Sequence, residues 1–211
     1  MALIGWIAAV EARSGSDRIR KKLIMESRSF ERKWLGDGLA PYRIGALFMA
    51  GLVIFCWVAR GPDHPVFGLV VVGWTLVLGP VVAAPVMLRL PARWFYVPAG
   101  EHIVHRAIGV GVFGWLLDRS GWNRRVALPM RGFKGAKTAL PSLELSLRGS
   151  ASAHGACFAI HIFLAALALF SGHSSGALWI LLPGVVVHLY PVLLQRSIML
   201  RLRPLLDRSG C

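Results

Sequence analysis

The sequence predicts an all-α membrane protein with four transmembrane helices and interfacial amphipathic helices. The mean hydropathy is +0.59, and 55% of the 211 residues are hydrophobic against 16% charged. Four apolar runs are each long enough to cross the roughly 30 Å hydrocarbon core as a helix. With four crossings, every Lys and Arg except Arg60 falls on one side of the membrane. The positive-inside rule predicts that this side is cytoplasmic.

Residues 1–40 are predicted to form an N-terminal interfacial and amphipathic region. The opening run MALIGWIAAV is too short to cross a bilayer, and it has neither a preceding positive charge nor a following small-residue cleavage pattern, so no signal peptide is expected. The segment Glu11–Trp34 mixes charges of both signs at helical spacings, which is typical of a helix on the membrane surface. We expect Trp6 at head-group level.

Residues 41–88 are predicted to form the first transmembrane hairpin. Its first span runs from Pro41 to Ala59, interrupted only by Arg43 near its start. The turn-rich link RGPDHP follows, and the second span runs from Val66 to Leu88. The two prolines late in that span are tolerable inside lipid, where they can kink the helix.

Residues 89–150 are predicted to form a basic cytoplasmic loop. A loop of this length is expected to carry structure of its own. The apolar, glycine-containing segment 103–122 is too short between charges to span. It predicts a helix that lies in the interface or re-enters the membrane shallowly, with Trp115 and Trp122 as anchors. The basic segment 125–144, punctuated by proline and glycine, is expected to lie on the surface.

Residues 151–211 are predicted to form the second transmembrane hairpin and a basic tail. The short polar turn SGHSSG forces the two apolar runs to be antiparallel neighbours. Counted outward from that turn, His154 should meet Gln195 and Arg196 at one membrane face, and His161 should face His188 deeper in. Polar side chains are costly in lipid unless they face protein, water or a ligand, so these polar residues of the hairpin are candidates for a functional site. The alternative is that interhelical hydrogen bonds simply join the helices.

Charge and cysteine usage restrict the partners. The net charge of +14 does not predict nucleic acid, because the basic residues interrupt apolar spans and form no polar patch with aromatic platforms. Membrane lipids with anionic head groups are the expected partners instead. The three cysteines have no metal or disulfide spacing. Nothing completes a haem or metal site around His161 and His188, so no metal site and no cofactor are expected.

His154 is the candidate catalytic residue. The ordinary pKa of histidine suits a general base, and a hydroxyl acceptor could approach from the membrane surface. A base is usually oriented by a partner such as a carboxylate, but Ala151, one turn earlier, is inert. The guanidinium groups of Arg93, Arg196 and Arg201 suit phosphate, carboxylate or a lipid head group. Membrane anchoring is the alternative for each arginine.

Three segments carry a family resemblance: RWFYV at 93–97, AHG at 153–155, and YPVLLQRSIMLRLRPLL at 190–206. They resemble the bacterial glycosyl-diaponeurosporenoate acyltransferases, which attach a fatty acyl chain to a carotenoid glucoside. In that pattern a Glu precedes the His by three residues, and a Gln-Arg-Tyr-Asn-Arg-x-Arg run ends the last span. This chain has Ala151 at the Glu position, Ile198 at the Asn position and Met199 at the second Arg position.

The resemblance implies a membrane-bound acyltransferase that acts on a carotenoid glycoside or a similar glycolipid acceptor. It implies that His154 is the base and that Gln195 and Arg196 orient acyl or head-group oxygens. Arg93 and Arg201 would hold an anionic donor, and Trp94 joins the substrate-binding set. It also implies the bacterial inner membrane, and the distribution of Lys and Arg predicts that both termini are cytoplasmic. The alternative is a non-catalytic accessory subunit that packs against protein partners in a respiratory or photosynthetic membrane complex.

Overall fold

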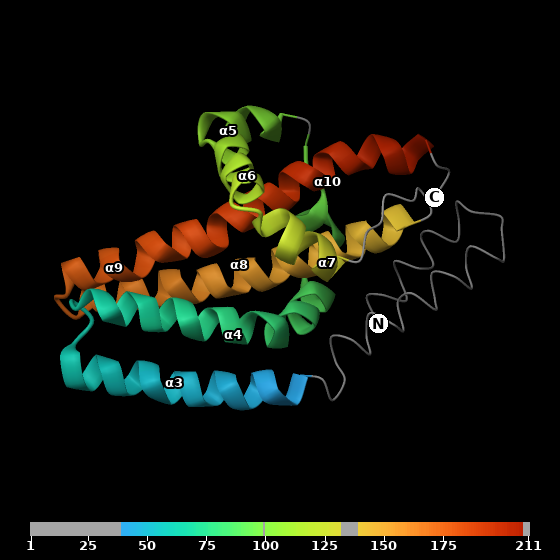
Figure 1. Ribbon diagram of the computed structural model, residues 1–211. Coiled ribbons are helices and arrows are strands. Elements are labelled where there is room, and N and C mark those ends of the chain that lie inside the picture. Colours follow the sequence, from blue (N-terminus) through green and yellow to red (C-terminus); the bar gives the residue numbers. More distant parts are fainter. Residues whose placement is uncertain (1–38, 99, 132–138, 209–211) are drawn as a thin grey trace. The chain divides into compact units, whose positions relative to one another are not determined.

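The computed structural model describes residues 39–98, 100–131 and 139–208 (Figure 1). These residues are helical and contain no strand, which confirms the predicted all-α class. Four helical stretches are long and apolar enough to cross a membrane. They cover residues 40–60, 65–83, 140–170 and 174–206. The predicted N-terminal interfacial region lies almost entirely outside the described residues.

The chain divides into two compact units. The first, called the hairpin unit here, comprises residues 34–86 and 152–192. The second, called the loop unit, comprises residues 1–33, 87–151 and 193–211. Three helices contribute residues to both units: α4 (Pro65–Arg89), α8 (Leu140–Phe170) and α10 (Tyr190–Arg208).

The hairpin unit contains α3 (Ala40–Arg60) and α4 (Pro65–Arg89) up to Val86. The bounds of both helices agree with the predicted spans to within one residue. Proline early in the first turn of α3 is compatible with a helix start, because that position has no intrahelical acceptor for an N–H. The helix ends at Arg60, and its C-cap Gly61 has a φ of 75°, which glycine adopts without strain.

The rest of the hairpin unit comprises most of α8, then α9 (Ser174–Gly184), the π-helical turn η5 (Val185–Leu189) and the first residues of α10. Figure 1 shows α8 and α9 as antiparallel neighbours, as the short turn predicts. The π-helical turn follows Pro183, which lacks the N–H that a regular helix would use. It carries His188. Turns of this kind frequently occur at functional sites.

Helices in the hairpin unit approach so closely that several glycines have no room for a side chain. A Cβ atom at Gly68 would lie 2.0 Å from the carbonyl oxygen of Trp179, and one at Gly184 would lie 2.6 Å from the ring of His161. Small residues at helix contacts are typical of membrane bundles, where packing replaces the hydrophobic effect as the driving force. The buried core beside them is apolar: Val53, Phe67, Val71, Ala165, Ala168 and Ile180.

At one end of the hairpin unit, Asp63 joins the α3–α4 link to the turn before α9. Its carboxylate accepts hydrogen bonds from Ser175 Oγ at 2.5 Å and from the Gly176 N–H at 2.8 Å, and it pairs with His173 Nδ1 at 2.6 Å. These contacts, led by the Ser175 hydrogen bond, lower the pKa of Asp63 to about 2. The two connections are therefore held together by one exposed acidic side chain.

The described part of the loop unit begins with short helices. They are η2 (Ala92–Phe95), α5 (Glu101–Ala107), α6 (Val110–Arg119), the π-helical η3 (Asn123–Ala127) and α7 (Leu128–Arg131). The prediction of one helix over residues 103–122 was wrong, because two helices share that segment. Gly109, with a φ of 74°, adopts a left-handed conformation that interrupts the helix.

Helix α8 begins at Leu140, ahead of the start predicted at Ala151. The prediction placed residues 140–150 in the surface loop because charges end the apolar run there. Those charges are compatible with a helix: Arg148 pairs with Glu144 one turn earlier, with Nη2 and Oε1 2.5 Å apart. The extra turns give α8 the residues that pack against α10 within the loop unit.

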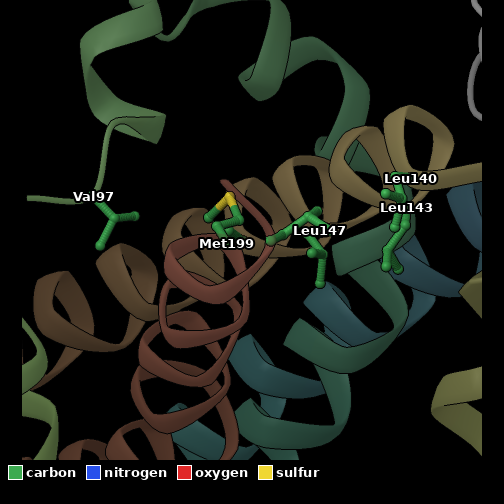
Figure 2. Close-up of a cluster of buried hydrophobic side chains, with 7 residues drawn as sticks. Val97, Leu140, Leu143, Leu147 and Met199 are labelled. Atoms are coloured by element: carbon green, nitrogen blue, oxygen red, sulfur yellow. The ribbon is translucent and has the colours of Figure 1, made fainter. Parts of the chain in front are cut away.

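The core of the loop unit joins the start of α8 to the end of α10. Figure 2 shows the side chains of Leu140, Leu143 and Leu147 on α8, with Met199 of α10 and Val97 of the segment after η2. Ala151 and Leu202 complete this buried cluster. It fixes the RWFYV segment beside the C-terminal helix, and so it brings two of the resemblance-bearing segments together.

Candidate functional site

A chain of hydrogen-bonded polar side chains crosses the hairpin unit. His154 and His161 lie on α8, His188 lies in η5, and Thr75 lies on α4. The ring centroids of His161 and His188 are 5.2 Å apart, which confirms the prediction that these two residues face each other. Both rings are buried, with 0% and 1% exposure.

Thr75 connects the two buried histidines. Its Oγ1 lies 2.8 Å from Nε2 of His188 and 3.2 Å from Nε2 of His161, and it is 3.0 Å from the carbonyl oxygens of Val71 and Val72. Thr75 was not among the predicted site residues, because its only sequence signal is a lone hydroxyl in a long apolar run.

His154 lies at the end of this chain. Its Nδ1 is 3.1 Å from Nδ1 of His188, and the two ring centroids are 5.4 Å apart. Unlike His161 and His188, His154 is only partly buried. His188 is therefore a hydrogen-bonding partner that could orient the His154 ring, a role for which Ala151 has no polar group.

The geometry does not suit metal binding by the two buried histidines. His161 Nδ1 bonds to the carbonyl oxygen of Ile180 at 2.8 Å and its Nε2 to Thr75, while both ring nitrogens of His188 contact Thr75 and His154. Each ring nitrogen thus already has a protein partner. Within residues 39–98, 100–131 and 139–208, no three His, Cys, Asp or Glu side chains are grouped as metal ligands.

In the loop unit, Arg196 binds Glu101 and the RWFYV backbone. Its Nε and Nη2 donate to the two carboxylate oxygens of Glu101 at 2.5 and 2.7 Å. Its Nη1 donates to the carbonyl oxygen of Trp94 at 2.7 Å, and Nη2 lies 3.4 Å from that of Tyr96. The hydrogen bond from Arg196 is the main reason that the pKa of Glu101 is lowered. Glu101 is a second residue that the sequence analysis missed.

Gln195 is buried and uses both ends of its side-chain amide. Its Oε1 accepts from Nη2 of Arg131 at 3.3 Å, and its Nε2 donates to Ser150 Oγ at 3.1 Å. Burial lowers the pKa of Arg131. Arg131 lies in the segment that was predicted to be on the surface, so only its contact with Gln195 identifies it as a candidate.

The other predicted binding residues are exposed in the loop unit. Arg93 and Arg201 are exposed, and Trp94 is 48% exposed. Close to them, the guanidinium of Arg203 lies over the ring of Tyr96, 4.4 Å from its centroid. Arginine over an aromatic ring is a favourable contact that adds to the hold of α10 on this segment.

The predicted site residues fall in different units. His154 belongs to the hairpin unit, whereas Arg93, Trp94, Gln195, Arg196 and Arg201 belong to the loop unit. Contacts within the loop unit join Arg196 to Trp94. The meeting of His154 with Gln195 and Arg196 stays a prediction.

The apolar helices and the polar chain between them define a multi-pass helical membrane protein. The chain belongs to the glycosyl-4,4'-diaponeurosporenoate acyltransferase family (CrtO), whose family model matches residues 91–208. The match begins two residues before the RWFYV segment, ends with α10 and includes all six predicted site residues. It confirms the resemblance, and no finding supports the accessory-subunit alternative. No curated protein sequence and no solved structure matches the chain.

Proposed function

We propose that this protein transfers an acyl group to a hydroxyl of a glycosylated carotenoid or a similar lipidic acceptor in the bacterial cytoplasmic membrane. Family membership over residues 91–208 supports the reaction class. Four apolar helices support an acceptor that is itself dissolved in lipid. The distribution of Lys and Arg supports cytoplasmic termini, because all of them except Arg60 then lie on the cytoplasmic side.

The single observation that carries the mechanism is the support of His154 by His188. A general base must keep one ring nitrogen open while its other nitrogen is held in place. In the proposed reaction, His154 Nε2 takes the proton of the acceptor hydroxyl as its oxygen bonds to the acyl carbon. The bond between the acyl carbon and the donor's leaving group then breaks. The protonated His154 returns its proton to the leaving group, so no net charge accumulates.

The loop unit supplies the proposed substrate-binding residues. Arg93 and Arg201 are exposed cations suited to an anionic donor, and Trp94 offers an exposed aromatic surface to an apolar chain. Gln195 and Arg196 already have protein partners for their polar atoms. We assign them a supporting part: Gln195 orients Arg131, and Arg196 holds the Trp94 segment against α10.

The experiment is acylation by the full chain and its His154 variants. In a bacterial host that makes the glycosylated acceptor, the ratio of acylated to free acceptor is measured in lipid extracts by mass spectrometry. His154→Ala and His154→Gln should each lower the initial rate by about 10²–10⁴-fold, the range for loss of a general base. His64→Asn is the matched control. His64 is exposed and accepts a hydrogen bond from the Val66 N–H, which asparagine can also accept.

Acylation at the parental rate by His154→Ala, with equal protein in the membrane fraction, would overturn the proposed base. Loss of acylation by His64→Asn as well would show that the assay reports folding and not catalysis. With the control active, a drop confined to the His154 variants supports the mechanism.

A further inference from the structure

The hydrogen bonds around Thr75 allow the proton positions of three histidines to be worked out. The carbonyl oxygen of Ile180 can only accept, so the facing Nδ1 of His161 must carry a proton. A neutral imidazole has one N–H, so Nε2 of His161 then holds a lone pair. That nitrogen is 3.2 Å from Thr75 Oγ1 and needs a donor.

The Thr75 hydroxyl has one proton, and several groups other than His188 can accept it: Nε2 of His161 and, at 3.0 Å, the carbonyl oxygens of Val71 and Val72. Whichever of them accepts this proton, it does not point to His188. Nε2 of His188, 2.8 Å from the same oxygen, must therefore donate to Thr75. A neutral His188 with a proton on Nε2 has a lone pair on Nδ1. That lone pair faces Nδ1 of His154 at 3.1 Å, so His154 must donate from Nδ1. Nε2 of His154 is left unprotonated.

The opposite polarity leaves a defect in a buried place. If Thr75 donated to His188, the Nε2 lone pair of His161 would face the lone pairs of the Thr75 oxygen, or His161 would carry two protons and a charge. His161 has no exposed surface, and a polar group left unpaired or a charge in an apolar interior is costly. The His154 ring also has a backbone contact at Val187. Because the nitrogen that faces a carbonyl must carry the proton, the assigned polarity requires that this nitrogen is Nδ1.

We propose that His188 is the positioning residue for His154, and that Thr75 and His161 set the direction of a hydrogen-bond chain that holds His154 in the tautomer with Nε2 unprotonated. This inference rests on the proposed function for its catalytic meaning. The hydrogen-bond chain orients His154 as a carboxylate partner would, and this sequence has no carboxylate at Ala151. It does so without a buried charge, since Thr75 and the three histidines are all neutral.

The test is nitrogen-15 NMR of the full-length protein, labelled at histidine and held in lipid nanodiscs. Signals are assigned by single substitution of each histidine in the chain. We expect a proton on Nδ1 of His154, on Nε2 of His188 and on Nδ1 of His161. A His154 signal with its proton on Nε2 would overturn the proposal.

Thr75→Val and Thr75→Ser form a matched pair of variants. Valine has nearly the shape of threonine but no hydroxyl, so His188 loses its acceptor and His154 should become a mixture of tautomers. Serine keeps the hydroxyl and should keep the parental tautomer. For acylation, we expect kcat to fall roughly tenfold in Thr75→Val, about the effect of one neutral hydrogen bond, with KM unchanged and with the rate restored in Thr75→Ser.

The two proposals fail in different ways. If His154→Ala abolishes acylation but His154 carries its proton on Nε2, the proposed hydrogen-bond direction is wrong and the assignment of His154 as the base is kept. If the tautomers are as expected but acylation does not depend on His154, the proposed function is wrong and the hydrogen bonds have only a structural role. If Thr75→Val keeps the parental His154 tautomer, the assigned direction of the chain is wrong. Thermal unfolding of each variant in nanodiscs identifies a drop that reflects misfolding.

Discussion

Replacing Glu101 by glutamine is expected to loosen the RWFYV segment from α10. Glutamine keeps the shape of the side chain but removes the charge that accepts two hydrogen bonds from Arg196, at 2.5 and 2.7 Å. Arg196 would then face a neutral amide while its other donors still bind the backbone of Trp94. The loss is therefore partial. Glu101 Oε1 also lies 3.2 Å from Nε2 of His105, so the substitution changes that contact as well.

The magnitude follows from burial. The side chains of Arg196 and Glu101 are 18% and 19% exposed, which lies between a solvent-exposed pair and a fully buried one. Exposed pairs contribute about 0–1 kcal/mol, whereas removing one partner of a buried pair costs about 3–5 kcal/mol. We expect Glu101→Gln to lower the free energy of unfolding by about 2–3 kcal/mol. For a chain of this size, that is a fall of about 5–10 °C in Tm.

The Glu144–Arg148 pair provides a matched control. Its side chains are 21% and 20% exposed, nearly the same as in the first pair, but both residues lie one turn apart on α8. A pair within one helix contributes only about 0.2–0.5 kcal/mol, so Glu144→Gln should change Tm by about 1–2 °C. The assay is thermal unfolding in detergent, followed by the fluorescence of the eight tryptophans. Equal Tm changes in Glu101→Gln and Glu144→Gln would refute this reasoning.

The pH dependence of the same pair has a definite sign. The pKa of Glu101 is lowered in the folded protein from its ordinary value of 4.5, chiefly by the hydrogen bond from Arg196. The stabilisation is therefore present above pH 4.5 and is lost as the pH falls through the folded-state pKa. The difference in Tm between the parent and Glu101→Gln should be full at neutral pH and should shrink below pH 4.5. A difference that grows on acidification would contradict the assignment.

Three further predictions concern other contacts. Gly68→Ala places a methyl group 2.0 Å from a backbone oxygen and should lower Tm by several degrees, whereas Gly51→Ala, with open space at its Cβ position, should leave Tm unchanged or raise it slightly. Asp63→Asn should lower Tm at neutral pH; because the pKa of Asp63 is about 2, the parent should lose this advantage only as the pH falls from 3.8 toward 2. Arg131→Met removes the guanidinium that contacts Gln195 and should raise the KM for the acyl donor more than it changes Tm, while an unchanged KM would count against Arg131 as part of the binding site.

The spans could be predicted from sequence because the free energy of transfer into lipid is summed over about 20 residues, so a single polar residue or proline changes the total little. The ends of α3 and α4 therefore agree with the apolar runs to within one residue. The start of α8 could not be found this way. There the helix continues through Glu144 and Arg148, whose pairing across one turn makes charged residues compatible with a helix that hydropathy alone ends at Ala151.

The facing of His161 and His188 could be predicted because both lie on one hairpin, where distance from the turn sets the register. Thr75 could not, because it is 86 residues from His161 and 113 from His188 along the chain. Its position depends on how α4 packs against that hairpin. The close approach of Gly68 to the backbone of α9 provides that packing, and no spacing rule contains it.

The assignment of Arg196 shows what residue type can and cannot decide. A guanidinium that binds a donor's anion and one that fixes a loop need the same planar set of N–H groups, so the motif alone predicts both. What distinguishes them is how many donors the fold leaves open. Arg196 uses its Nε and both Nη atoms on Glu101 and two carbonyl oxygens, whereas Arg131 donates to Gln195, a neutral amide. Among the described residues, the side chain that accepts from Arg131 is thus a neutral amide, whereas the one that accepts from Arg196 is a carboxylate. On this ground we expect an anionic substrate to gain more from Arg131 than from Arg196.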